Sequence, residues 1–129
     1  MLDEPFIVAV SRLRGLRVLI VEDSWYIAKA VESLLEDVGM VIAGAAATAT
    51  VAERFARERA PKVAVVDVKL RDGMAFGLID RLHDLGVHVV VVSGFAAFST
   101  PPGRVAAILQ KPFSGDELLT ALCTVVPAI

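Results

Sequence analysis

The sequence predicts a doubly wound α/β fold, in which helices cover both faces of a five-stranded parallel sheet. Two observations support this prediction. Short apolar runs rich in β-branched residues recur at fairly regular intervals. Most of these runs are unbroken rather than alternating, as expected for parallel strands that are buried on both faces. Between them, apolar residues follow the three-to-four spacing of helices. This alternation favours a sheet with the strand order 2-1-3-4-5.

The five expected strands occupy residues 17–21, 41–45, 63–66, 87–92 and 105–109. The run at 87–92, VHVVVV, is the longest candidate for a membrane span. It has the length of a strand and falls well short of the roughly 20 apolar residues that cross a bilayer. We therefore expect no membrane insertion.

The apolar stripes predict helices over residues 27–38, 50–60, 74–85 and 114–125. Thr50 with Glu53, and Ser114 with Glu117, have the spacing of capping boxes that start a helix. The crossover before the fifth strand, SGFAAFSTPPGR at 93–104, contains two consecutive prolines and a glycine. Because these residues cannot continue a helix, the fourth crossover helix is expected to be short or absent.

Composition limits the classes of function. A chain of 129 residues fits one domain, which we place at 16–129 after an N-terminal arm or added strand at 1–15. A net charge of −2 gives no electrostatic surface for nucleic acid. The single cysteine excludes an internal disulfide. Because acids precede the short apolar patch near the N-terminus, we predict no secretory signal and a cytoplasmic location.

Polar side chains follow four of the five expected strands. Glu22 and Asp23 follow the first strand, Asp67 the third, Ser93 the fourth and Lys111 the fifth. Ligands of open parallel sheets bind outside the carboxyl ends of the strands. We therefore expect these five residues to converge on one edge of the sheet.

The converging residue types point to phosphoryl chemistry. Three neighbouring carboxylates repel one another unless a cation or protons neutralise them. Oxygen ligands suit Mg²⁺, which commonly pairs with phosphate. A lysine and a hydroxyl would bind the remaining phosphoryl oxygens. A carboxylate that attacks phosphorus forms an acyl phosphate.

The chain resembles a CheY-like response regulator receiver domain over residues 16–125. The segments that carry the resemblance are VLIVEDS (18–24), VAVVDVKLRDG (63–73), VVVVSG (89–94) and LQKPF (109–113). It implies that Asp67 is the phosphoacceptor and that Glu22, Asp23, Asp67 and the main-chain carbonyl of Lys69 bind Mg²⁺. It also implies phosphoryl-binding roles for Ser93 and Lys111, and a cis Lys111–Pro112 bond.

The resemblance implies a single-domain response regulator of a two-component phosphorelay. A sensor histidine kinase would phosphorylate Asp67, and the phosphorylated chain would signal by contact with a phosphotransfer protein or a downstream regulator. Such a domain is not an enzyme beyond its own phosphorylation and dephosphorylation. The alternative is a phosphate-independent interaction module, and a homodimer is left open.

Three positions depart from the family pattern. Ile108 occupies the position of the family's switch aromatic, and Arg71 replaces a common proline. Lys69 places a cation two residues after Asp67. The short fourth crossover with its SGF segment resembles a subset of alphaproteobacterial single-domain regulators. We expect Trp25 to be partly packed in the core.

Overall fold

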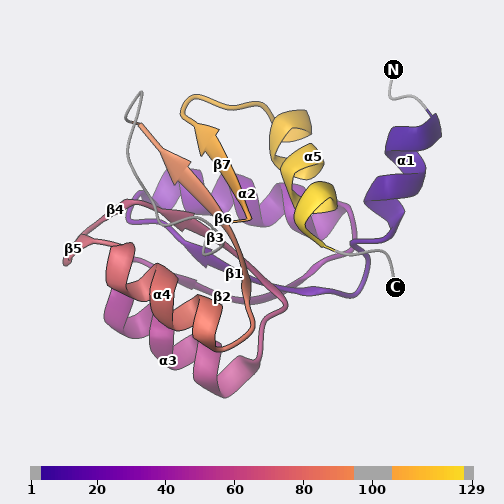
Figure 1. Ribbon diagram of the computed structural model, residues 1–129. Helices are drawn as coiled ribbons and strands as arrows, with labels where there is room; N and C mark the ends of the chain where they lie inside the picture. Colours follow the sequence, from indigo (N-terminus) through magenta and orange to yellow (C-terminus); the bar gives the residue numbers. More distant parts are fainter. Residues whose placement is uncertain (1–3, 95–105, 127–129) are drawn as a thin grey trace.

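The computed structural model describes residues 4–94 and 106–126 (Figure 1). Its helices are α1 (Glu4–Ser11), α2 (Trp25–Asp37), α3 (Ala49–Arg59), α4 (Phe76–Asp84) and α5 (Gly115–Val125). Its strands are β1 (Arg17–Val21), β2 (Val41–Ala46), β3 (Val63–Asp67), β4 (Lys69–Leu70), β5 (Gly73–Met74), β6 (His88–Ser93) and β7 (Ala107–Gln110). The predicted strands agree with β1, β2, β3, β6 and β7 to within one or two residues at each described end.

The main sheet has the order β2-β1-β3-β6-β7, and every neighbouring pair is parallel. Because β6 and β7 are its fourth and fifth strands, this is the predicted 2-1-3-4-5 order. Every residue of the central strand β3 is buried. Its last residue, Asp67, is aligned with Val92 of β6. The carboxylate of Asp67 therefore stands at the end of the most enclosed strand.

Two apolar layers fill the space between the sheet and the helices. Alternate strand residues such as Val65 and Val90 pack against α2 and α5. Their neighbours, such as Val66 and Val91, pack against α3 and α4 on the opposite face. Figure 1 shows α3 and α4 together on one side of the sheet, with α2 and α5 on the other. Each fully buried aliphatic side chain contributes about 1.5–3 kcal/mol, so the two layers hold the strand ends in place.

Polar caps set the first residues of three helices. Ser24 caps α2, and Ser114 with Glu117 forms the predicted capping box of α5. The capping box predicted for Thr50 and Glu53 is wrong. Thr48 caps α3 through a 3.2 Å hydrogen bond from the Val51 N–H, because Thr48 has the extended backbone that a cap requires.

The helix predicted over 74–85 begins later than expected. Met74 belongs to β5, which pairs antiparallel with β4 in a hairpin with a two-residue loop, and α4 starts at Phe76. Asp72 and Gly73 are typical turn residues, and Gly73, directly after the two-residue loop, has a φ of +124°, which favours glycine. A short hairpin therefore separates Asp67 from the next helix.

The N-terminal residues form a helix rather than the added strand that the sequence left open. Leu13 is fully buried, and Phe6 and Val10 pack beside it against the layer under α5. The division of the chain at residue 15 stays a prediction. The predicted short or absent fourth crossover helix falls on residues 95–105, outside the described residues. Among the described helices, none has the length and apolar character needed to cross a membrane.

Candidate phosphoacceptor site

The carboxyl ends of β1, β3, β6 and β7 bring the predicted site residues to one edge of the sheet. Glu22 and Asp23 lie in the turn between β1 and α2, and Asp67 ends β3. Ser93 ends β6 and is buried. Its main-chain carbonyl accepts a 2.7 Å hydrogen bond from the Lys111 backbone N–H. This backbone contact ties the residue after β7 to the end of β6.

Three carboxylates form the centre of the site. One oxygen each from Glu22, Asp23 and Asp67 lies within 4.8 Å of the others. Glu22 and Asp67 are only 7% and 8% exposed, while Asp23 is half-buried. The structure therefore confirms the expected convergence of the acidic residues, with two of them withdrawn from water.

Lys111 reaches into this acidic cluster. Its Nζ donates to Glu22 Oε1 at 2.8 Å and to Asp67 Oδ2 at 3.0 Å. The Lys111–Pro112 peptide bond is cis, as the resemblance implies. One ammonium thus neutralises part of the charge of two buried carboxylates.

Burial raises the pKa of Glu22 to about 7, and the adjacent Asp67 carboxylate acts in the same direction, while Lys111 lowers it only in part. For Lys111 the ion pairs outweigh the effect of burial on the pKa. Burial lowers the pKa of the Lys111 amine, but its hydrogen bonds and ion pairs with Glu22 and Asp67 outweigh burial and raise it. An added proton or cation would relieve the repulsion between these carboxylates.

The donor set fits Mg²⁺. The second carboxylate oxygen of Glu22, Oε2, is buried and has no hydrogen-bond partner among the described residues. A buried carboxylate oxygen without a partner is costly, and a bound cation would satisfy it. Oxygen-only ligands with one half-buried residue leave room for the several waters that Mg²⁺ retains. Glu22, Asp23 and Asp67 are the residues that would hold the ion.

Lys69 begins β4 immediately beyond the site. Its backbone N–H donates to Asp67 Oδ1 at 3.3 Å, and the residue itself is exposed. The two oxygens of Asp67 therefore have different partners, because Lys111 holds Oδ2. The role of the Lys69 carbonyl as a metal ligand stays a prediction.

Two residues of the hairpin tip make contacts that were not expected from the sequence. Arg71 Nη2 donates to the main-chain carbonyl of Asp23 at 3.2 Å. The carboxylate of Asp72 accepts from the Ala49 N–H at 3.0 and 3.2 Å, at the start of α3. The Asp72-Gly73 pair indicates a turn at this point, but it does not predict which residues Arg71 and Asp72 contact.

Two further residues that the sequence singled out are exposed. Trp25 is 64% exposed, so the prediction that it packs partly in the core is wrong. Its ring meets that of Tyr26 edge to face at the start of α2. Ile108, at the position of the family's switch aromatic, is 53% exposed on β7.

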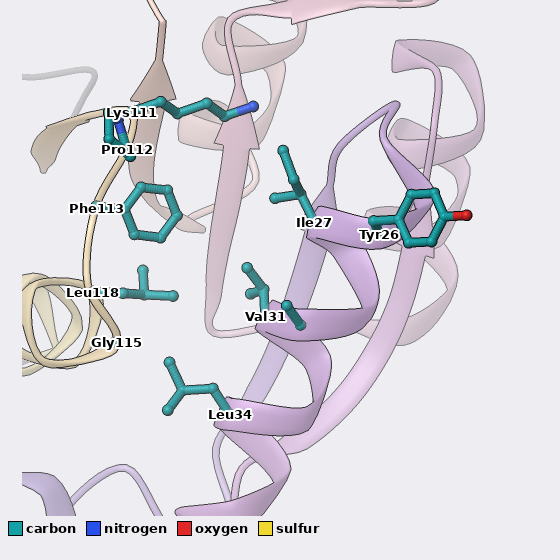
Figure 2. Close-up of a pocket in the computed structure, with 10 residues that line it drawn as sticks. Tyr26, Ile27, Val31, Leu34, Lys111, Pro112, Phe113, Gly115 and Leu118 are labelled. Carbon is teal, nitrogen blue, oxygen red and sulfur yellow. The ribbon is translucent and has the colours of Figure 1, made fainter.

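An apolar groove of about 640 Å³ lies between α2 and the segment from Lys111 to α5. Figure 2 shows Ile27, Val31 and Leu34 on one wall, with Phe113 and Leu118 facing them. Lys111 lines the end of the groove, and its amino group is the one that contacts Asp67. The groove and the carboxylate cluster therefore share one residue.

Comparison with protein-family models gives one match, to the response regulator receiver domain, over residues 18–123. A search of curated proteins finds no significant match.

Solved structures of receiver domains share the fold. The receiver domain of the PhyR response regulator from Erythrobacter litoralis is 25% identical, with a TM-score of 0.74 over 90% of this chain and 97% of that one. A CheY-like receiver protein from Methanospirillum hungatei is also 25% identical, with a TM-score of 0.73 over 84% and 90% of the two chains. The response regulator PhyR from Brucella abortus is 24% identical, with a TM-score of 0.78 over 92% of this chain. This chain spans about half the length of that protein, with 50% covered.

Proposed function

Because the chain belongs to the response regulator receiver domain family, we propose that Asp67 accepts a phosphoryl group from a sensor histidine kinase in a two-component phosphorelay. A receiver domain is a signalling module rather than an enzyme of the ordinary kind. The observation that carries the proposal is the position of Lys111, which contacts the buried Asp67 and Glu22 together. A lysine that was simply exposed to water at the strand end would not contact two buried carboxylates.

The transfer that we propose forms one bond and breaks one. A carboxylate oxygen of Asp67 attacks the phosphorus of a phosphohistidine, and an O–P bond replaces the P–N bond. The electron pair of the P–N bond remains on the imidazole nitrogen. Burial between β1 and β6 holds the Asp67 carboxylate at a fixed position, which supplies the positioning that such transfers need.

The other site residues stabilise charge. Mg²⁺, held by Glu22, Asp23 and Asp67 when it is bound, would supply neutralising charge for the phosphoryl oxygens. Lys111 already lies 3.0 Å from Asp67 Oδ2, so its ammonium is close enough to follow an added phosphoryl oxygen. Ser93, next to the residue aligned with Asp67, is proposed to donate its hydroxyl to another oxygen. The resulting change of charge would alter the binding of a phosphotransfer protein or a downstream regulator.

Labelling with acetyl phosphate tests this proposal without a partner protein. The wild-type chain with Mg²⁺ is expected to gain one acid-stable, hydroxylamine-sensitive phosphoryl group, measured by intact mass. Asp67→Asn is expected to gain none. Asp84→Asn is the matched control, because it removes an exposed carboxylate at the end of α4, outside the site. Equal labelling of the wild type and Asp67→Asn would contradict the proposal.

The second candidate is a phosphate-independent interaction module. The exposed Ile108 at the switch position favours it, because no aromatic ring is available there to respond to phosphorylation. A Mg²⁺ titration monitored by Trp25, the only tryptophan of the chain, separates the two candidates. Absence of a response at millimolar Mg²⁺, together with absence of labelling, would favour the second.

A further inference from the structure

The hairpin β4–β5 connects the two loops that carry the metal-binding carboxylates. Its base follows Asp67, where the Lys69 N–H contacts Oδ1. Its tip consists of Arg71 and Asp72, because Leu70 pairs with Gly73. From this tip, Arg71 reaches back to the main-chain carbonyl of Asp23. The hairpin thus links the end of β3 to the turn after β1.

The segment before α3 also holds the hairpin tip. The Arg71 N–H donates to the Ala47 carbonyl at 3.4 Å, and the carboxylate of Asp72 caps the Ala49 N–H. These contacts fix the position of the tip relative to α3. The hairpin therefore holds the Arg71 side chain where its guanidinium contacts the backbone of Asp23.

We infer that Arg71 is a positioning residue for the metal site. By holding the Asp23 backbone, it sets the spacing between the Asp23 and Asp67 carboxylates before the cation binds. Glu22 and Asp67 are fixed by burial and by Lys111. Asp23 is half-buried and lies in the turn that Arg71 contacts. A constraint on its backbone lowers the ordering that Mg²⁺ binding would otherwise require.

The direction in which Mg²⁺ affinity changes when Arg71 is replaced tests this inference. An arginine near three carboxylates repels a divalent cation, so loss of its charge alone should strengthen Mg²⁺ binding. Loss of a charge-assisted hydrogen bond that positions Asp23 should weaken binding instead. The two effects of replacing Arg71 therefore have opposite directions, and the observed direction shows which one dominates.

The inference rests on the proposed function, and Arg71→Met tests it. Mg²⁺ affinity is measured by Trp25 fluorescence and by calorimetry, and the acetyl phosphate labelling rate is measured at saturating Mg²⁺. Lys29→Met is the matched charge control, because it removes an exposed cation of α2, the helix that follows the Asp23 turn, and touches no site residue. Asp23→Asn is the control for the metal site. Arg71 is exposed, so its replacement leaves both apolar layers intact, which thermal unfolding verifies.

We expect the dissociation constant of Mg²⁺ to rise roughly three- to tenfold in Arg71→Met, in line with a lost charge-assisted hydrogen bond. It should stay close to the wild-type value in Lys29→Met. The labelling rate at saturating Mg²⁺ should stay within about twofold of wild type, because excess cation compensates for weaker binding. Binding by Arg71→Met as tight as wild type, or tighter, would overturn the inference while the proposed function stands. No Mg²⁺ binding and no labelling in the wild type would overturn both.

Discussion

The ammonium of Lys111 lies 3.0 Å from the carboxylate of Asp67, although 44 residues separate them in the chain. The contact exists because β3 and β7 end at the same edge of the sheet, on either side of β6. Lys111 also donates to Glu22 at 2.8 Å. This one side chain therefore connects the nucleophile that we propose, its acidic neighbour and the apolar groove beside α2.

Replacement of Lys111 should separate metal binding from phosphorylation. In Lys111→Met we expect tighter Mg²⁺ binding, because a competing cation has been removed. We also expect acetyl phosphate labelling at saturating Mg²⁺ to slow by roughly tenfold or more, because a donor to the transferred group is missing. Lys62→Met, which alters an exposed lysine, should behave as wild type. Labelling of Lys111→Met at the wild-type rate would show that Lys111 has no part in the transfer.

The stability of the metal-free protein should depend on Glu22 near neutral pH. Its pKa is about 7 in the folded state, against an ordinary value of 4.5 for a glutamate in water. The folded protein therefore binds the extra proton between these values, and the contribution of Glu22 to the free energy of unfolding falls as the pH rises from about 4.5 to 7. Glu22→Gln does not titrate at this position. The free energy of unfolding of the variant, relative to that of wild type, should therefore rise by roughly 1–3 kcal/mol from pH 5 to pH 8.

Thermal unfolding with a chelator at the two pH values measures this difference. At pH 8, added Mg²⁺ should raise the Tm of wild type more than that of Glu22→Gln, because the cation stabilises the ionised Glu22 only in the wild type. A constant gap from pH 5 to pH 8 would mean that Glu22 ionises as it does in the unfolded chain.

The strands and most of the site could be predicted because their signals are local. Unbroken β-branched runs indicate buried parallel strands, and parallel strands align their carboxyl ends, so Glu22, Asp67 and Lys111 were expected to meet. The contact between Arg71 and Asp23 could not be predicted. It joins a side chain to a backbone carbonyl 48 residues away, and such a contact imposes no pattern on the residues around it.

Helix starts were predicted less well where two similar residues compete. Thr48 and Thr50 are both suitable caps by composition, and the backbone conformation after β2 selects Thr48. Glu53 is then free of a capping role and forms ion pairs with Arg57 and with Arg81 of α4. The N-terminal run around Phe6 is too short for its periodicity to separate helix from strand.

Ala60 offers a test of backbone strain that is independent of the site. It ends α3 in the left-handed region, with φ 45° and ψ 59°, where an L-residue with a side chain is disfavoured and glycine is not. Ala60→Gly should therefore stabilise the protein by about 0.5–1 kcal/mol, and its Tm should rise by a few degrees. The same substitution at Ala30, exposed within α2, should cost about 1 kcal/mol, because it places glycine in a helix interior. If Ala60→Gly lowers the Tm as Ala30→Gly does, then the left-handed turn carries no strain that glycine relieves.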